Sequence, residues 1–157
     1  MKRTFLLFQI LLLLFVCAPG ARAQGNVKSG PDPATIRDPE LEKDSLHNLE
    51  VARHYFKLKK AYVAALRRCE EIDAGNPTFA KLDEVLFIAG ESSLRLSENK
   101  GKQTFKGKSP EDLKLDARVY FSRLVTEYPQ SAFRKQAEEE LSALGGPIHK
   151  TAEAPKP

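Results

Sequence analysis

The residues best suited to metal chemistry are two histidines with a glutamate between them, His47, Glu50 and His54. On a helix they would share one face, but the two histidines would lie roughly 10 Å apart along the axis. Ligands at that separation need a third element to hold one ion, and no HExxH, CxxC or paired-carboxylate motif accompanies them. The sequence therefore favours a solvated surface, and we expect no metal and no other cofactor.

Phosphate and thiol chemistry are the next candidates. Residues 101–109 (GKQTFKGKS) have the composition of a phosphate-binding loop, but they lack the four-residue gap before Gly-Lys-Ser/Thr and a preceding strand. The lysines around Phe105 favour a mobile solvated loop over a contact with anionic lipid or an acidic partner. Cys69 is predicted to be a small buried helix residue rather than a reactive thiol. Without a catalytic constellation, we expect that the protein is not an enzyme.

The N-terminal segment predicts export. Residues 1–23 combine a charged start, an apolar run and the small residues of a cleavage site, as in a secretory signal peptide. The apolar run is too short to cross a bilayer, which needs ~20 residues. Cleavage after Ala23 is favoured, and the alternative is lipidation at Cys17, which would anchor the product by acyl chains. We therefore expect a periplasmic protein, associated with the outer membrane if Cys17 is lipidated.

The charge balance argues against nucleic acid as a partner. The chain has 25 basic and 21 acidic residues, with a formal net charge of +4. Three of the basic residues lie in the predicted signal peptide, which leaves 22 basic against 21 acidic. A nearly neutral mature chain has no global attraction for nucleic acid.

The remaining chain is predicted to be helical, because apolar residues recur at intervals of three and four. Residues 24–38 read as a flexible linker and 145–157 as a disordered tail, since both are rich in glycine, proline and polar residues. Between them we expect about five helices, the first over 39–58, the second over 61–74 and the last over 132–144. Asp38 and Ser109 are predicted to cap helices, and Gly75 to end one in a left-handed conformation.

The spacing of small and large residues indicates a repeated helical hairpin. Ala65, Cys69, Ile72 and Pro77 recur at the same intervals as Ala117, Phe121, Leu124 and Pro129. These intervals are those of the 34-residue tetratricopeptide repeat, with a loop insertion at 97–112. Arg53 stands where that repeat usually has a small residue. We expect an all-α, tetratricopeptide-like solenoid of two hairpins and a C-terminal capping helix.

Two segments resemble a known family. Residues 48–77 (NLEVARHYFKLKKAYVAALRRCEEIDAGNP) and 117–141 (ARVYFSRLVTEYPQSAFRKQAEEEL) are similar to the recurring units of BamD, the outer-membrane lipoprotein of the β-barrel assembly machinery. BamD proteins carry about five repeats, so a helical domain at 39–144 resembles a short relative. The resemblance implies a non-catalytic interaction scaffold of the bacterial cell envelope, in outer-membrane protein assembly. The alternative is a periplasmic adaptor for cell-wall or secretion machinery.

The resemblance also implies where partners bind. In such solenoids, one face of the first helix of each hairpin lines a concave groove. A protein or peptide partner, laid along the groove, would suit its mixed charge and its aromatic residue. The alternative is a solvated helix face with Phe87 in the core. The predicted groove residues are His47, Glu50, His54, Lys57, Glu84, Phe87, Glu91, Leu94 and Arg95.

Overall fold

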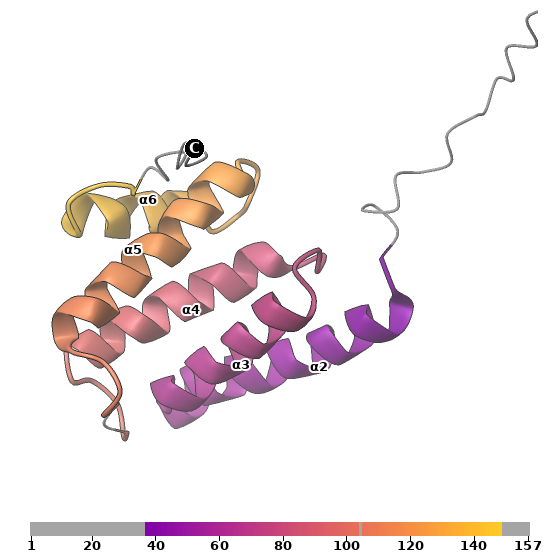
Figure 1. Cartoon of the computed structure of the whole chain (residues 1–157), viewed down its shortest axis with the longest axis horizontal. Helices are drawn as coiled ribbons and strands as arrows, with labels where there is room; N and C mark the ends of the chain where they lie inside the picture. The colour runs from indigo at the N-terminus through magenta and orange to yellow at the C-terminus, as the bar shows by residue number, and fades with distance from the viewer. Residues whose placement is uncertain (1–36, 104, 149–157) are drawn as a thin grey trace, which may run out of the picture. The chain divides into compact units, whose positions relative to one another are not determined.

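A computed structural model describes residues 37–103 and 105–148 (Figure 1). The predicted signal peptide, Cys17, most of the predicted linker and residues 149–157 lie outside this range. The described residues form helices and no strand, which confirms the all-α class. The helices are α2 (Pro39–His54), the π-helix η2 (Tyr55–Lys59), α3 (Tyr62–Gly75), α4 (Leu82–Ser97), α5 (Pro110–Glu127) and α6 (Arg134–Ala143).

Two helices begin where the sequence predicts. The Asp38 side chain accepts a hydrogen bond from the backbone N–H of Glu40 at 2.9 Å, and a proline starts α2. Ser109 caps α5 in a reciprocal capping box with Asp112, and a proline again follows the cap. Each cap satisfies backbone donors that have no partner within the helix, so both predictions are confirmed.

The first hairpin turns differently from the prediction. The sequence predicts one helix to residue 58, but α2 ends at His54 and the wider η2 follows it. Lys60 comes directly after η2 and has a φ of +52°. α3 ends at Gly75, which does not have a positive φ, and Asn76 follows with an extended φ of −141°, so the predicted left-handed cap at Gly75 is wrong. The reason is tertiary: the buried Asn76 amide donates to Ser45 Oγ on α2 at 3.1 Å.

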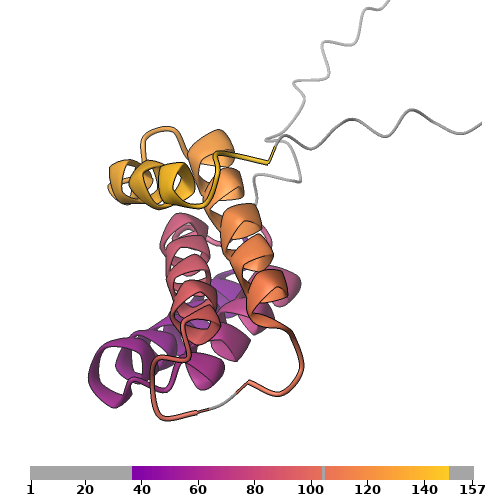
Figure 2. The ribbon, with the colours of Figure 1, turned by 90° about the vertical axis from the view of Figure 1, so that its left-hand side faces the viewer.

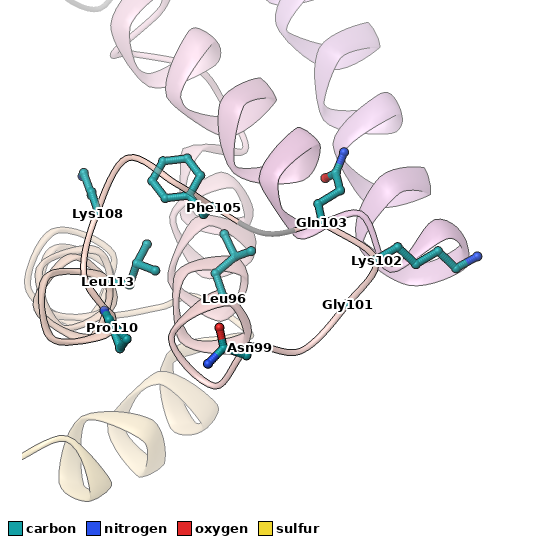
Figure 3. A pocket seen from close by; sticks show the side chains of 9 residues that line it. All are labelled: Leu96, Asn99, Gly101, Lys102, Gln103, Phe105, Lys108, Pro110 and Leu113. Carbon is teal, nitrogen blue, oxygen red and sulfur yellow. The ribbon is translucent and has the colours of Figure 1, made fainter.

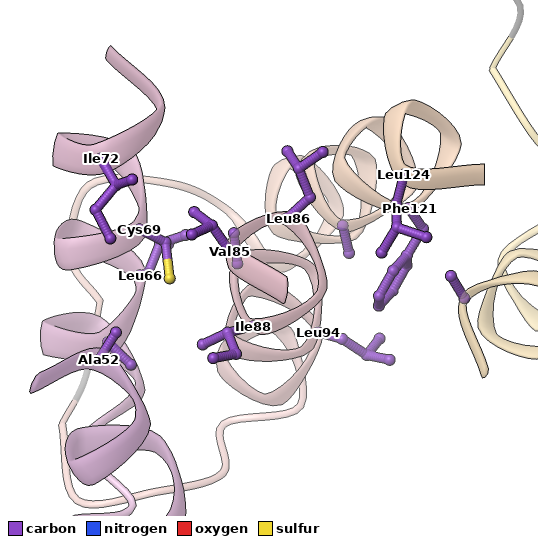
Figure 4. Packing of buried hydrophobic residues seen from close by; sticks show 14 of the residues in the cluster. Ala52, Leu66, Cys69, Ile72, Val85, Leu86, Ile88, Leu94, Phe121 and Leu124 are labelled. Atoms are coloured by element: carbon purple, nitrogen blue, oxygen red, sulfur yellow. The ribbon is translucent and has the colours of Figure 1, made fainter. Parts of the chain in front are cut away.

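Helix α4 lies at the centre of the described helices. Most of its residues are buried, because it packs against α3 on one side and α5 on the other. In two views at right angles, the first hairpin and α6 lie on opposite sides of it (Figures 1 and 2). Figure 4 shows Cys69 and Ile72 of α3 on one side of α4, and Phe121 and Leu124 of α5 on the other. One apolar core therefore extends through all five α-helices.

Small residues allow this close packing. Ala65 on α3 and Ala117 on α5 are completely buried, and their small side chains let neighbouring helices approach closely. At Gly90 on α4, an added Cβ would lie 2.6 Å from the ring of Phe121. No side chain fits at that distance, so the contact between α4 and α5 needs glycine there.

The segment that follows α6 makes more contacts with the helices than the sequence predicts, and the bounds of two other elements also differ from the prediction. The loop between α4 and α5 spans 98–109, slightly less than the predicted insertion, and α6 is shorter than the predicted last helix. Residues 145–148, which the sequence places in a disordered tail, contact α5. There Arg118 donates to the Gly146 carbonyl at 2.9 Å, and the Ile148 N–H donates to Ser122 Oγ at 2.9 Å. Among the described helices, none has the length and apolar character needed to span a membrane.

Candidate partner-binding surface

The face of α2 that the sequence assigns to the groove is open to solvent. His47, Glu50 and His54 are all exposed, and their spacing of three and four residues places them on one side of the helix. Lys57 is also exposed, but it belongs to η2 rather than to α2. This half of the prediction therefore corresponds to a polar surface that a partner can reach.

The corresponding face of α4 is linked to α2 by an ion pair. Both nitrogens of the Arg53 guanidinium fork donate to the Glu84 carboxylate, at 2.6 and 2.5 Å. The hydrogen bond from Arg53 holds the pKa of Glu84 below its usual value, and the same bond raises the pKa of Arg53. The two side chains are 29% and 16% exposed, so the pair is only partly screened by water. Glu84 is thus held in place by α2 before any partner arrives.

One turn after Glu84 on α4, the same side of the helix carries an aromatic residue that belongs to a cluster of three phenylalanines. Phe87 stacks on Phe133, which precedes α6, with ring centroids 4.9 Å apart. It also lies 6.1 Å from the ring of Phe121. Phe87 is half-buried and packs against the core, as the alternative interpretation of the sequence predicts for much of its side chain. One part of the ring remains accessible.

A second ion pair follows on the same stripe of α4. Arg95 donates to Glu91 at 2.8 Å, and Glu91 is buried, so the expectation that it is exposed in a groove is wrong. Burial is the largest influence on the pKa of Arg95 and would lower it, but the charge and hydrogen bond of Glu91 together with the charge of Glu98 outweigh burial and raise the pKa. Glu140 on α6 faces this pair, and burial and then the charge of Glu91 raise its pKa. Arg95, one third exposed, pairs with Glu91 and, at 4.0 Å, with Glu98.

Leu94 is buried too, and it lies at the base of a groove instead of on an exposed face. The groove has a volume of about 580 Å³ and is bounded by α4, α5 and α6. Leu115 on α5 is half exposed at its edge, and Leu144 lies at the other side. The structure thus replaces an exposed Leu94 with a recess that has an apolar floor and charged rims.

The ion pair between Arg53 and Glu84 links the exposed side of α2 to the stripe on α4. The α2–α4–α6 face is the name used below for the adjoining groove together with His47, Glu50, Arg53, His54, Glu84, Phe87, Arg95 and Glu140. Sequence reasoning missed Glu140, because nothing local marks it: it reaches the face through the packing of α6. Arg53 carried a signal, since a long charged residue stood at a position that is usually small. Lys57 lies in η2, but its charge helps to lower the pKa of Glu84, so it stands beside the face.

Two observations bear on metal and thiol chemistry in this protein. Within the described residues, no group of three or more His, Cys, Asp or Glu side chains is arranged to hold a metal ion. Cys69 is a free thiol, buried between α3 and α4 as the sequence predicts, and burial raises its pKa. A buried thiol with a raised pKa is a poor nucleophile.

Comparisons with protein-family models, with curated proteins and with solved structures found no match for this chain, so its function is inferred from the α2–α4–α6 face.

Proposed function

We propose that the protein is a non-catalytic scaffold that binds other proteins on the α2–α4–α6 face. The fold would be a short tetratricopeptide-like solenoid in which α2 and α3 form one hairpin, α4 and α5 a second, and α6 the cap. The recurring intervals and the complete burial of Ala65 and Ala117 support this assignment. Such hairpins need neighbours to cover their apolar faces, and α6 would provide that cover at one end.

The observation that carries the proposal is the chemistry of the stripe on α4. Charges of both signs, Glu84 and Arg95, flank the half-buried Phe87, and all three have fixed surroundings. A pre-ordered aromatic with charges on either side is the kind of surface on which interfaces concentrate their binding energy. The exposed α2 residues extend it with further polar groups. A peptide or helix with charges of both signs and a central apolar side chain would match this face.

The biological setting is proposed from the sequence resemblance. As a short relative of BamD, the protein would be exported and act in the cell envelope, in outer-membrane protein assembly. Mass spectrometry of the mature N-terminus tests the export route, because a free Gln24 indicates cleavage after Ala23 and an acylated Cys17 indicates a lipoprotein. An N-terminus at Met1 in the mature protein would contradict export by either route.

The test of the binding face is affinity purification from an envelope extract with matched variants. The test variant carries His47→Glu, Glu50→Lys and His54→Glu on exposed α2 positions. The control carries Arg67→Glu, Glu71→Lys and Ala74→Glu, exposed positions of similar spacing on α3. A partner that binds the α2–α4–α6 face is retained by the wild type and the control and lost by the test variant.

The identity of the retained partner decides the setting. Recovery of a barrel-assembly component in mild detergent supports the BamD-like role, and recovery of cell-wall or secretion proteins supports the alternative adaptor role. Equal retention by all three proteins would contradict binding on this face. Circular dichroism of each variant confirms that the helices are intact.

A further inference from the structure

The tertiary structure brings two lysine-rich segments together that lie about forty residues apart in the sequence. They are the turn of the first hairpin, 57–60 (KLKK), and the described residues 98–103 and 105–109 of the loop between α4 and α5. The backbone N–H of Lys102 donates to the carbonyl of Lys60 at 3.2 Å. An added Cβ at Gly101, whose φ is +99°, would lie 2.7 Å from the same carbonyl, so the two backbones are in direct contact. We call these two segments the basic end.

The loop is held in place at the basic end. The Gln103 side chain accepts a hydrogen bond from the backbone N–H of Ala64 at 3.3 Å, near the start of α3, where no side chain of the helix itself caps it. On the other side, Phe105 packs against the core and lines a pocket of about 180 Å³ with Leu96 and Leu113 (Figure 3). The described parts of the loop, 98–103 and 105–109, therefore present their lysines from a backbone that contacts the neighbouring helices.

The charge of the basic end is strongly one-sided. Glu98 is the one acidic residue within the two segments. It pairs with Lys100 at 2.8 Å, and Lys108 pairs with Asp116 of α5 at 2.5 Å. The segments together contain seven lysines, namely Lys57, Lys59, Lys60, Lys100, Lys102, Lys106 and Lys108. A nearly neutral chain thus concentrates positive charge at one end.

The most exposed large apolar side chain of the described residues lies among the lysines of the basic end. Leu58 is 71% exposed and stands between Lys57 and Lys59. Its exposure needs an explanation, because nothing in the described part of the chain covers it. Long lysine side chains around a leucine can reach phosphate groups while the leucine enters the acyl layer beneath them.

We propose that the basic end binds the surface of a bilayer that contains anionic lipids, with Leu58 inserted at the interface. An acidic protein would satisfy the lysines alone, whereas a bilayer satisfies both the lysines and Leu58. Basic residues near an anionic bilayer each add to binding, and the effect weakens with salt. This site adjoins the α2–α4–α6 face, because Glu98 also lines the groove of that face and the charge of Lys57 acts on Glu84.

The absence of tryptophan from the chain allows a direct test, because Leu58→Trp introduces a single fluorescent reporter at the basic end. The full chain with this substitution is titrated with vesicles of neutral lipid, with or without about one third phosphatidylglycerol. Leu41→Trp, at an exposed leucine on α2 away from the basic end, is the matched control. A reporter at position 58 remains informative even if the N-terminal segment itself anchors the chain, because it senses whether this end contacts lipid.

We expect a blue shift of emission and quenching by brominated lipids for Leu58→Trp with anionic vesicles, and little change with neutral vesicles or for Leu41→Trp. Adding Lys59→Gln, Lys60→Gln, Lys102→Gln and Lys106→Gln should raise the lipid concentration for half-maximal shift at least tenfold. The same number of changes at the exposed Lys43, Lys81, Lys114 and Lys135 should leave it within about twofold.

Three results would overturn the proposal. One is an unchanged emission of Leu58→Trp with anionic vesicles, and another is an equal shift at both reporters, which would mean contact without orientation. The third is a shift with poly-glutamate but not with vesicles, which would identify an acidic protein as the ligand of this end. Circular dichroism of the lysine variants separates loss of lipid binding from loss of folding.

Discussion

The helix pairs α2–α3 and α4–α5 pack their two helices together in different ways. In the second hairpin the large Phe121 is accommodated by Gly90, which leaves the space of a side chain for the ring. In the first pair the proposed repeat would place the small Cys69 and the long Arg53 at the corresponding positions, and the Arg53 head group donates to Glu84 on α4. A large core residue thus requires glycine at the partner position, whereas a small one leaves that position free to link hairpins.

The largest expected difference between the hairpins comes from truncating the core residue in each. Phe121→Ala should lower the free energy of unfolding by about 3–5 kcal/mol, because it removes a completely buried ring. Cys69→Ala removes one sulfur atom and should cost about 1 kcal/mol. Urea unfolding of both variants measures the two values. Equal losses of stability would contradict the proposed difference between the two hairpins.

The next effect concerns the glycine opposite the ring. Gly90→Ala gains helix propensity but forces Cβ against Phe121, so we expect a net loss of about 1–2 kcal/mol. Gly75→Ala, at the open end of α3 where a Cβ meets nothing within 4 Å, should be neutral or slightly stabilising.

A double-mutant cycle checks the cause of that loss. In a Phe121→Leu background, Gly90→Ala should cost less than in the wild type, because the smaller side chain leaves room. Identical costs in both backgrounds would mean that Gly90 is needed for another reason.

The ion pair that links the hairpins should contribute less than the core. Glu84→Gln should lower the free energy of unfolding by about 1–2 kcal/mol near neutral pH, since it leaves the Arg53 fork without its charged partner. The exposed Glu139→Gln on α6 is the control and should change stability little.

The pH dependence of stability sharpens this prediction. The folded-state pKa of Glu84 lies below its usual 4.5, so its contribution is complete above that pH and is lost as the pH falls through the lower folded-state value. Below about pH 4.5, the wild type should therefore lose stability with acid more steeply than Glu84→Gln. Parallel curves for the two proteins would contradict a lowered pKa.

The smallest expected effect compares the two connections. Lys60 and Asn99 both have a φ of +52°, one at the end of η2 and one after α4. Lys60→Gly should stabilise the protein by about 0.5–1 kcal/mol, because lysine is strained in the left-handed region. Asn99→Gly should change less, since asparagine tolerates that region. Thermal unfolding of the two variants measures the difference, and an equal response would contradict strain at Lys60.

Sequence reasoning was most successful where one residue acts locally. Asp38 and Ser109 cap helices as predicted, because capping depends on a side chain and the next few backbone amides. It was less successful at Gly75, where glycine suggested a left-handed ending. Contacts with α2 hold Asn76 in an extended conformation instead, and no local pattern contains that information.

The candidate surface divides in the same way. The sequence placed His47, Glu50 and His54 on one exposed face of a helix, since helical spacing alone fixes their direction. Burial of Glu91 and Leu94 depends on α5 and α6 covering α4, and the approach of Glu140 to Arg95 depends on where α6 docks. The spacing of apolar residues predicts which side of each helix faces the core. It does not predict how much of α4 a short terminal helix such as α6 covers.

By itself, the sequence determined the helical class, the two capped starts and the intervals that bury Ala65 and Ala117, because each follows from helical periodicity or from a side chain next to its own backbone. The tertiary structure alone decided that Arg53 pairs with Glu84 and that the lysines of 57–60 and 98–109 share one end. Those contacts join residues about thirty to forty positions apart, and their formation depends on how the helices pack against one another, which no local spacing encodes.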